Sequence, residues 1–414
     1  MEVDSPRLVL ILKSLSHHVY PMARELAVRL SGRFQLVCLH ASWDYRKEFG
    51  WKTPGLEEPW VIRMWESETA RDLAKKVIAD ADAVAFMDVP PEMVEERLRK
   101  NRLTFLMTER PFLRGWWSLH HRRVRRILRS AWKYRHQSGY HLLAIGRHCA
   151  PDFLRVGMFR GRCHRFGYFS ELPTDESVLT GSDAVVDESG EHPFTILWAG
   201  RMVRFKRLDR LVDAVRRCRA ILRDTGELRP ERPLRLRLIG GGKMLGTVRK
   251  WIRQSGIDDL TTLEPFQPPE TIRRAMREAS VYVFPSDARE GWGAVVGESM
   301  SLGLPVIASD TAGSAEWLVR NPPFLCRGDS SCAREMAATL VRYYREPERL
   351  RAIGQEMAEY IREMWSPHVA AERLLKLIDS LSDSLVLPPS DSSPSTIPEW
   401  TDGPCSPATF PDSR

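Results

Sequence analysis

Long apolar runs are missing from this sequence. No stretch of eighteen consecutive apolar residues occurs in its 414 residues, so no membrane-spanning helix is predicted. The stretch MEVDSPRLVLILKSL at the amino terminus has an early acidic residue and only a short apolar run. We interpret it as a first strand rather than a signal peptide, and we expect a cytoplasmic protein.

Cysteines at metal-binding or redox spacing are also missing. The seven cysteines are odd in number and scattered, and no Cys-x-x-Cys occurs. This pattern favours a reducing compartment and argues against a zinc site or a disulfide framework. The seven are Cys38, Cys149, Cys163, Cys218, Cys326, Cys332 and Cys405.

Acidic residues are too few to balance the basic ones. The formal net charge is +8 and the isoelectric point is near 9.2, which favours an anionic partner without identifying it. The apolar fraction of 43% is typical of a globular protein, and the length allows two domains with separate cores.

The stretch from 281 to 310, VYVFPSDAREGWGAVVGESMSLGLPVIASD, organises the C-terminal half of the chain. Its pattern predicts a buried strand at 281–284, a polar loop, a helix from near Trp292 and a second buried strand at 305–308. A loop that follows a parallel strand lies at the carboxyl edge of the sheet, where open α/β folds bind their ligands.

This loop and helix carry groups that suit a charged sugar ligand. Glu290 lies in the loop and Glu298 roughly two turns into the predicted helix, and both carboxylates can accept hydrogen bonds from hydroxyl groups. Between them, Gly291, Trp292 and Gly293 precede the free backbone N–H groups of a helix start, which favour an anion. The combination suits a nucleoside diphosphate that carries a sugar.

The spacing of the two glutamates resembles a known family. Glu290, seven intervening residues and Glu298 look like the Glu-x7-Glu signature of retaining glycosyltransferases of the GT-B fold, family 4 (group 1) type. The resemblance covers the C-terminal half clearly and the N-terminal half loosely. It implies two Rossmann-like, doubly wound parallel-sheet α/β domains that face a cleft. It also implies a metal-independent transfer of a sugar from a nucleoside-diphosphate sugar, with no other cofactor.

Alternating strand and helix patterns agree with this architecture. Strands are predicted at 7–14, 35–40, 61–65, 83–87, 103–108, 195–199 and 235–239, with helices at 19–30, 70–79, 91–100, 331–345 and 348–363. We expect an acceptor-side domain at 1–170, a linker at 171–193, a donor domain at 194–362, a C-terminal helix at 363–385 that returns to the first domain, and a disordered tail at 386–414.

The second domain opens with a candidate diphosphate clamp. Gly200 and Arg201 follow the strand at 195–199, and Lys206 lies five positions after Arg201 where a helix begins. The resemblance implies that this arginine and lysine neutralise the leaving diphosphate. It also implies that Phe266 and Ser286 frame the nucleotide base.

The N-terminal domain offers weaker signals. The loop SLSHHVYP lacks the glycines that the resembled family usually has there, and His17 and His18 either replace backbone donors or occupy a polar turn. Glu109 is a candidate acceptor-side group, or it anchors a neighbouring arginine. The resembled family often places a histidine of this domain near the donor sugar, and His17, His18, His120 and His121 are the candidates for it. The pair Asp80 and Asp82 imitates a metal-binding Asp-x-Asp but lies between a helix end and a strand, so we predict a turn and no catalytic metal.

The stretch from 110 to 137 contains many arginines, no acid and several interleaved aromatic residues. Three interpretations stay open: contact with an anionic membrane or an acceptor phosphate, contact with nucleic acid, and a solvated helix whose apolar side packs onto the domain. Nucleic acid is not the expected partner.

Two short stretches, TERPFLRG and RGRCHRFGYFSELP, resemble bacterial surface-polysaccharide enzymes. They suggest a lipid-linked glycan acceptor in capsule or exopolysaccharide synthesis, on the inner face of the plasma membrane. The missing glycines leave a second function open, namely a non-catalytic nucleotide-sugar-binding subunit that supports a partner enzyme.

Overall fold

The structure is a computed structural model that describes residues 7–41, 54–173, 193–320, 322–386 and 401–408. The chain divides into two compact units. The first comprises 1–48, 52–171 and 364–414, and the second comprises 49–51 and 172–363. Each unit is built on one parallel sheet, which confirms the predicted α/β class with two doubly wound domains.

The first unit has a seven-stranded sheet in the order β3-β2-β1-β4-β5-β7-β8. Its strands are β1 (Leu8–Leu12), β2 (Phe34–Cys38), β3 (Val61–Arg63), β4 (Ala83–Met87), β5 (Thr104–Glu109), β7 (Tyr140–Ile145) and β8 (Cys163–Phe166). Its helices are α1 (Tyr20–Leu30), α3 (Glu68–Asp80), η1 (Pro91–Val94), α4 (Glu95–Arg99), η2 (Trp117–His120), α5 (Arg122–Lys133), α6 (Cys149–Leu154) and α15 (Pro367–Val386), and a short strand β6 (Leu113–Trp116) lies outside the sheet. All residues of β1 and β7 are buried, because helices cover both faces of a parallel sheet.

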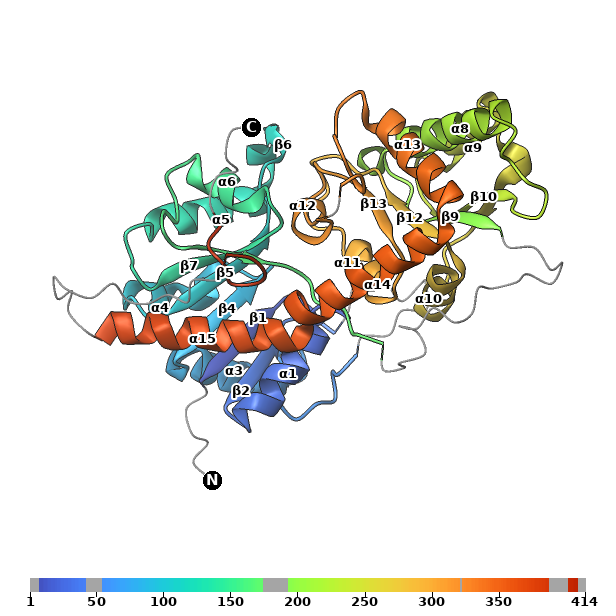
Figure 1. The fold of residues 1–414 in the computed structure, drawn as a ribbon. Coiled ribbons are helices and arrows are strands. Elements are labelled where there is room, and N and C mark those ends of the chain that lie inside the picture. The colour runs from blue at the N-terminus through green and yellow to red at the C-terminus, as the bar shows by residue number, and fades with distance from the viewer. Residues whose placement is uncertain (1–6, 42–53, 174–192, 321, 387–400, 409–414) are drawn as a thin grey trace. The chain divides into compact units, whose positions relative to one another are not determined.

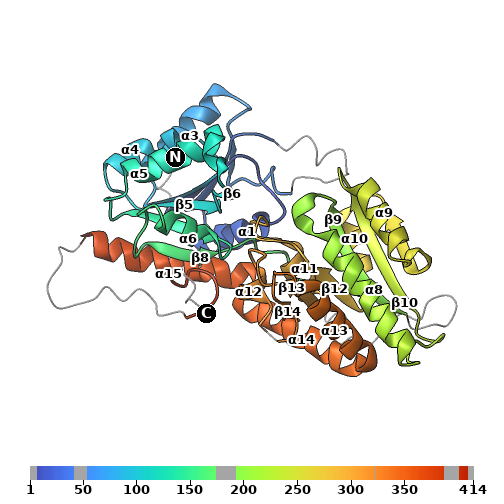
Figure 2. The ribbon, with the colours of Figure 1, turned by 90° about the horizontal axis from the view of Figure 1, so that it is seen from above.

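The second unit has a six-stranded sheet in the order β11-β10-β9-β12-β13-β14. Its strands are β9 (Phe194–Arg201), β10 (Leu234–Gly241), β11 (Thr261–Glu264), β12 (Val281–Phe284), β13 (Val306–Ser309) and β14 (Leu325–Cys326). Its helices are η3 (Arg204–Lys206), α8 (Leu208–Asp224), α9 (Leu245–Gln254), η4 (Asp258–Leu260), α10 (Pro269–Glu278), α11 (Val295–Ser301), α12 (Ala315–Leu318), α13 (Cys332–Arg345) and α14 (Pro347–Met364). Helix α13 packs beside α8 (Figures 1 and 2).

The end of the chain belongs to the first unit. Helix α15 packs along α1 (Figure 1). Beyond it, the segment 401–408 lies against the edge strand β8, where Arg165 N–H donates to Ser406 O (2.7 Å) and Cys405 N–H donates to Arg165 O (2.8 Å). The expectation of disorder at 386–414 is therefore wrong for 401–408. An edge strand offers unpaired backbone groups, and the buried Cys405 side chain adds apolar contact.

Candidate functional site

Strand order in the second unit creates a switch point between β9 and β12. The chain passes from β9 to β10 and β11 on one side, and then crosses to β12, β13 and β14 on the other. The loops that leave β9 and β12 therefore diverge at the carboxyl edge, which is where open α/β sheets bind ligands.

These two loops are joined by hydrogen bonding and by charge. Asp287 N–H donates to Phe205 O at 2.9 Å. The Nζ atom of Lys206 lies 2.6 Å from Oε2 of Glu290, and both side chains are largely buried, with 14% and 12% exposed. The same Nζ lies 5.2 Å from the centroid of the Phe284 ring. Two residues that were singled out from separate motifs are thus in direct contact.

Glycines allow the ends of β9 and β10 to approach closely. A Cβ on Gly240 would lie 2.0 Å from Gly200 O, and a Cβ on Gly242 would lie 2.8 Å from Met202 O. Arg201 is exposed at the end of β9, opposite Gly241 in register. The ring of Phe266 lies against Gly241, where a Cβ would be 3.4 Å from the ring. The predicted clamp arginine and the predicted base-framing phenylalanine therefore lie at the same edge.

The loop that carries Glu290 is held by a second loop. Gly313 N–H donates to Glu290 O (3.2 Å), and Ser314 N–H donates to Trp292 O (3.0 Å). Trp292 is only 2% exposed, and its ring meets Trp317 edge-on at 6.0 Å. Ser286 is fully buried. Both side chains lie in the packing beneath the loop rather than on its surface.

Helix α11 begins later than predicted. Gly293 has a φ of +87°, which a right-handed helix does not accommodate, so the helix starts at Val295 instead of near Trp292. Glu298 consequently lies in the first turn of α11 and not two turns in. The prediction was wrong because apolar periodicity does not report a positive φ.

The two glutamates of the motif both lie near Tyr282. The Tyr282 hydroxyl donates to Ala199 O at 2.9 Å, and burial raises the pKa of this phenol, with smaller contributions from Glu298 and Glu290. Burial also raises the pKa of Glu298 to about 7, against a small opposing effect of Arg273. A carboxyl group with this pKa changes charge near neutral pH.

The part of the chain that contains these residues is similar to known proteins. Residues 193–346 match the family model described as "Glycosyl transferases group 1". This segment is therefore similar to group 1 glycosyltransferases. The match confirms the resemblance at the level of group 1, and family 4 membership and retention stay predictions.

Curated proteins match this chain at modest identity. The amylovoran biosynthesis glycosyltransferase AmsK of Erwinia amylovora is 24% identical over 195 residues, which is 46% of each chain. A GDP-mannose-dependent alpha-(1-6)-phosphatidylinositol monomannoside mannosyltransferase of Mycobacterium tuberculosis is 27% identical over 191 residues, 45% of this chain and 47% of that protein. The chain thus matches about half the length of these relatives.

A solved structure shares the fold over most of the chain. Anabaena Alr3699/HepE in complex with UDP is similar with a TM-score of 0.63 and 14% identity, over 90% of this chain and 99% of that one. The fold is therefore GT-B.

In the first unit, three candidate groups gather at the carboxyl edge of the sheet. The ring of His18 stacks on Tyr168 at 5.7 Å, and the Tyr168 hydroxyl donates to Oε1 of Glu109 at 2.9 Å. The ring of His17 lies 3.7 Å from that of His18. Tyr168 was not predicted, because a lone tyrosine after a strand has no diagnostic spacing.

The remaining candidates of this unit, and the arginine next to Glu109, have different surroundings. Arg110 pairs with the buried Asp152, with Nη2 3.0 Å from Oδ1. His120 stacks on Trp117 at 5.5 Å, and His121 is exposed at the start of α5. Asp82, in the turn between α3 and β4, pairs with Arg33.

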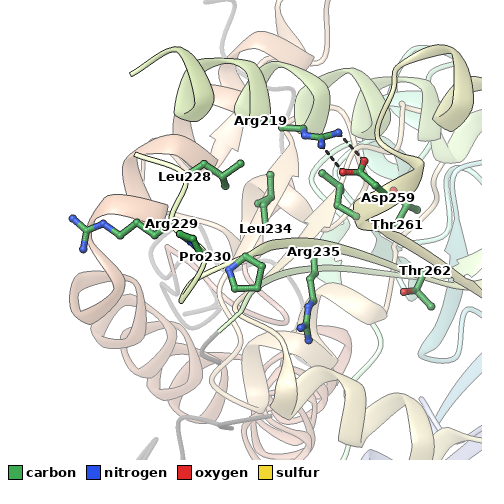
Figure 3. A pocket seen from close by; sticks show the side chains of 11 residues that line it. Arg219, Leu228, Arg229, Pro230, Leu234, Arg235, Asp259, Thr261 and Thr262 are labelled. Atoms are coloured by element: carbon green, nitrogen blue, oxygen red, sulfur yellow. Dashed lines mark hydrogen bonds and ion pairs between the residues drawn. The ribbon is translucent and has the colours of Figure 1, made fainter. Parts of the chain in front are cut away.

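A cavity of about 480 Å³ lies at the opposite edge of the sheet of the second unit (Figure 3). It includes Leu234 and Thr261, the first residues of β10 and β11, and an ion pair between Arg219 and Asp259. None of the predicted site residues lines it, and the amino edge of a parallel sheet is not where such folds hold ligands.

Among the helices that the structure describes, none combines the length and the apolar character that a membrane span requires.

Proposed function

We propose that this protein transfers a sugar from a nucleoside diphosphate to a hydroxyl group of a glycan acceptor, with retention at the anomeric carbon. The observation that carries the proposal is the contact between Lys206 and Glu290 at the switch point of a segment similar to group 1 glycosyltransferases. In a lysine–carboxylate pair at such an edge, the lysine can bind a diphosphate and the carboxylate can accept hydrogen bonds from sugar hydroxyls.

Each candidate residue then has a role. Arg201 and Lys206 neutralise the negative charge that develops on the leaving diphosphate, and the backbone of 291–293 donates N–H groups to it. Glu290 accepts hydrogen bonds from the sugar and Glu298 from the ribose. Phe266 lies along the base. Since the two cations carry the leaving-group charge, we propose a reaction that needs neither a metal nor another cofactor.

The acceptor is proposed to be a lipid-linked glycan of a surface polysaccharide. One relative is named for amylovoran biosynthesis, and another is named for a phosphatidylinositol mannoside, which is a glycolipid. A cytoplasmic protein would meet such an acceptor at the inner face of the plasma membrane. Glu109, Tyr168 and His18 are the groups of the first unit that we propose for the acceptor side.

A non-catalytic sugar-nucleotide-binding subunit is the second candidate, because histidines stand where the resembled family has glycines in the loop after β1. The two functions differ in turnover and not in binding. Thermal stabilisation by UDP-, GDP- and ADP-sugars identifies the donor, since a ligand that binds the folded state raises the melting temperature.

The deciding experiment is a transfer assay with that donor on Lys206→Met and Glu290→Gln. Both variants should lose at least tenfold in kcat/KM, because each removes a charge-assisted contact. Arg237→Met is the matched control, since Arg237 pairs with Glu264 on the same sheet at a similar exposure (24% and 22%). A wild-type protein that binds a donor but neither hydrolyses nor transfers it would favour the subunit. Equal losses in the control would refute the assigned roles.

A further inference from the structure

A surface of the first unit exposes large aromatic side chains. Trp116 is 69% exposed and Trp117 is 76% exposed, and the neighbouring Leu113 is 39% exposed. These residues lie in β6 and η2, directly before helix α5. Grouped apolar side chains of this size at a surface commonly mark an interface.

Helix α5 adds a row of cations beside these side chains. Leu128 and Ala131 are buried, so this side of the helix packs onto the unit. Arg122, Arg125 and Arg129 follow the i, i+3, i+7 spacing of another face and are exposed. None of these three arginines forms an ion pair with a residue that the structure describes.

A groove of about 650 Å³ is lined by residues of α5 and of the segment formed by η1 and α4. Its cations are Arg122, Arg125, Arg126, Arg129 and Lys133, and its carboxylates are Glu92 and Glu95. The two carboxylates pair with Arg126 and Lys133. Five cations against two carboxylates leave three positive charges, which belong to the unpaired arginines.

We propose that this α5 surface, defined by Leu113, Trp116, Trp117, Arg122, Arg125 and Arg129, binds the face of an anionic phospholipid bilayer. The tryptophans lie at the level of the headgroups, where the apolar part of each ring faces the lipid tails and its N–H group faces water. The three arginines, which all line the groove, bind lipid phosphates. The binding is independent of sugar transfer and would hold for a catalytically silent protein.

Nucleic acid would use the same arginines but explains the rest less well. An exposed Leu113 beside the tryptophans offers nothing to a phosphate backbone, whereas it adds apolar area at a membrane interface.

The test is flotation of the full-length protein with vesicles of phosphatidylcholine alone or mixed with phosphatidylglycerol. One variant is Arg122→Gln/Arg125→Gln/Arg129→Gln, and a second is Trp116→Ser/Trp117→Ser. The matched control is Arg223→Gln/Arg249→Gln/Arg253→Gln, which removes the same charge from exposed positions of α8 and α9 in the other unit. Circular dichroism checks that every variant is folded.

The wild type should bind the mixed vesicles and not the neutral ones. The arginine variant should lose roughly 100-fold in the partition coefficient and the tryptophan variant at least tenfold, while the control stays within about twofold. Brominated lipid should quench tryptophan fluorescence in the wild type and much less in Trp116→Ser/Trp117→Ser. Glycerol phosphate in solution should not displace the protein from the vesicles, because this small phosphate offers no bilayer for the tryptophans.

Equal binding of the wild type to both kinds of vesicle would overturn the proposal, as would an equal loss in the control. Displacement by glycerol phosphate would replace the bilayer with a small soluble phosphate. Double-stranded DNA that binds as tightly as the mixed vesicles at the same salt concentration, and with the same arginine dependence, would assign the surface to nucleic acid. Failure of the transfer assay would leave the vesicle result unaffected.

Discussion

Lys206 and Glu290 form an ion pair in a largely buried position of the second unit. Their contact at 2.6 Å is largely shielded from water. In such a place each charge depends on the other, because an uncompensated buried charge is costly. A diphosphate would give Lys206 a second anionic partner, so ligand and carboxylate act on the same cation.

This dependence predicts a stability defect that nucleotide repairs. Glu290→Gln should lower the free energy of unfolding by about 1–3 kcal/mol, since Lys206 loses its carboxylate. UDP or the preferred nucleotide should recover most of the loss because a phosphate then pairs with Lys206. Chemical denaturation with and without nucleotide measures both effects. If nucleotide stabilised the wild type and left this variant unchanged, the phosphate would not be at Lys206.

Glu298 predicts a pH dependence of binding. Its pKa is raised from 4.5 to about 7, so between these values the folded protein keeps a proton that the unfolded chain releases. The free energy of unfolding therefore falls as pH rises from about 4.5 to 7 and is level above that. Ribose hydroxyls that donate to the carboxylate favour its charged form, so nucleotide affinity should rise through pH 7 and then level.

Isothermal titration calorimetry across this pH range tests the expectation. Glu298→Gln cannot ionise, so its weaker binding should be independent of pH, and its stability at pH 8 should exceed that of the wild type. A wild-type affinity that is flat from pH 6 to 8 would count against a ribose contact at Glu298.

At the scale of elements, the loop between β12 and α11 depends on one glycine. Gly293 combines a φ of +87° with a position where a Cβ would lie 2.3 Å from Cζ of Phe284. Phe284 is the ring beneath Lys206, so a shift there also moves the lysine. The conformation of this loop and the position of Lys206 are therefore coupled.

Gly293→Ala should lower nucleotide affinity at least tenfold and reduce the melting temperature, because both the backbone and Phe284 have to move. Gly297→Ala is the control on the next helix, where the nearest atom to the added Cβ is Leu318 Cδ1 at 3.8 Å. That change should be neutral or stabilise by up to about 1 kcal/mol, as alanine favours a helix. Similar behaviour of the two variants in thermal shift and titration would contradict the coupling.

Arg97 holds the end of another element, helix α3. Its guanidinium donates to Ile78 O (3.0 Å) and Ala81 O (2.7 Å) at the end of the helix, and to Leu103 O (3.0 Å) before β5. The side chain is 2% exposed, and burial lowers its pKa to about 9, which leaves it charged at neutral pH. A single cation thereby satisfies carbonyls that the helix cannot satisfy itself.

Arg97→Met should destabilise the first unit by about 2–4 kcal/mol, because several buried carbonyls lose their donor. Arg99→Met, two residues away and exposed, should change the free energy of unfolding by less than about 0.5 kcal/mol. Urea denaturation followed by circular dichroism compares them. A small effect at Arg97 would mean that water replaces the guanidinium.

At the scale of the whole chain, the last described segment completes a unit that begins at the other end of the sequence. Besides its backbone bonds to β8, the segment 401–408 is held by Arg373, which donates to Asp402 O at 2.5 Å. The edge of β8 is therefore covered by residues more than 200 positions later.

Ending the chain after residue 400 should uncover this edge. We expect a loss of about 2–4 kcal/mol in the free energy of unfolding and a greater tendency to aggregate, because backbone groups and apolar surface are exposed together. Ending it after residue 408 keeps every described contact and is the control. Light scattering and thermal melts of both proteins provide the measurement, and identical behaviour would argue that the segment contributes nothing.

Most strands could be read from the sequence because parallel strands buried on both faces appear as short, continuous apolar runs. The strands at 83–87 and 281–284 were predicted to the residue. The start of α11 and the packed segment 401–408 could not be predicted. One depends on a single positive φ, and the other on a strand edge that lies far away in the sequence.

The sequence by itself determined the alternation of strands and helices, the glutamate pair of the second unit and the basic, aromatic stretch at 110–137. These are local patterns, and local patterns are set by neighbouring residues. Only the tertiary structure decided that Lys206 meets Glu290, that Tyr168 links His18 to Glu109, and which arginines of α5 have no ion-pair partner among the described residues. Such pairs join positions that are far apart in the chain, and it is the order of strands in each sheet that brings them together.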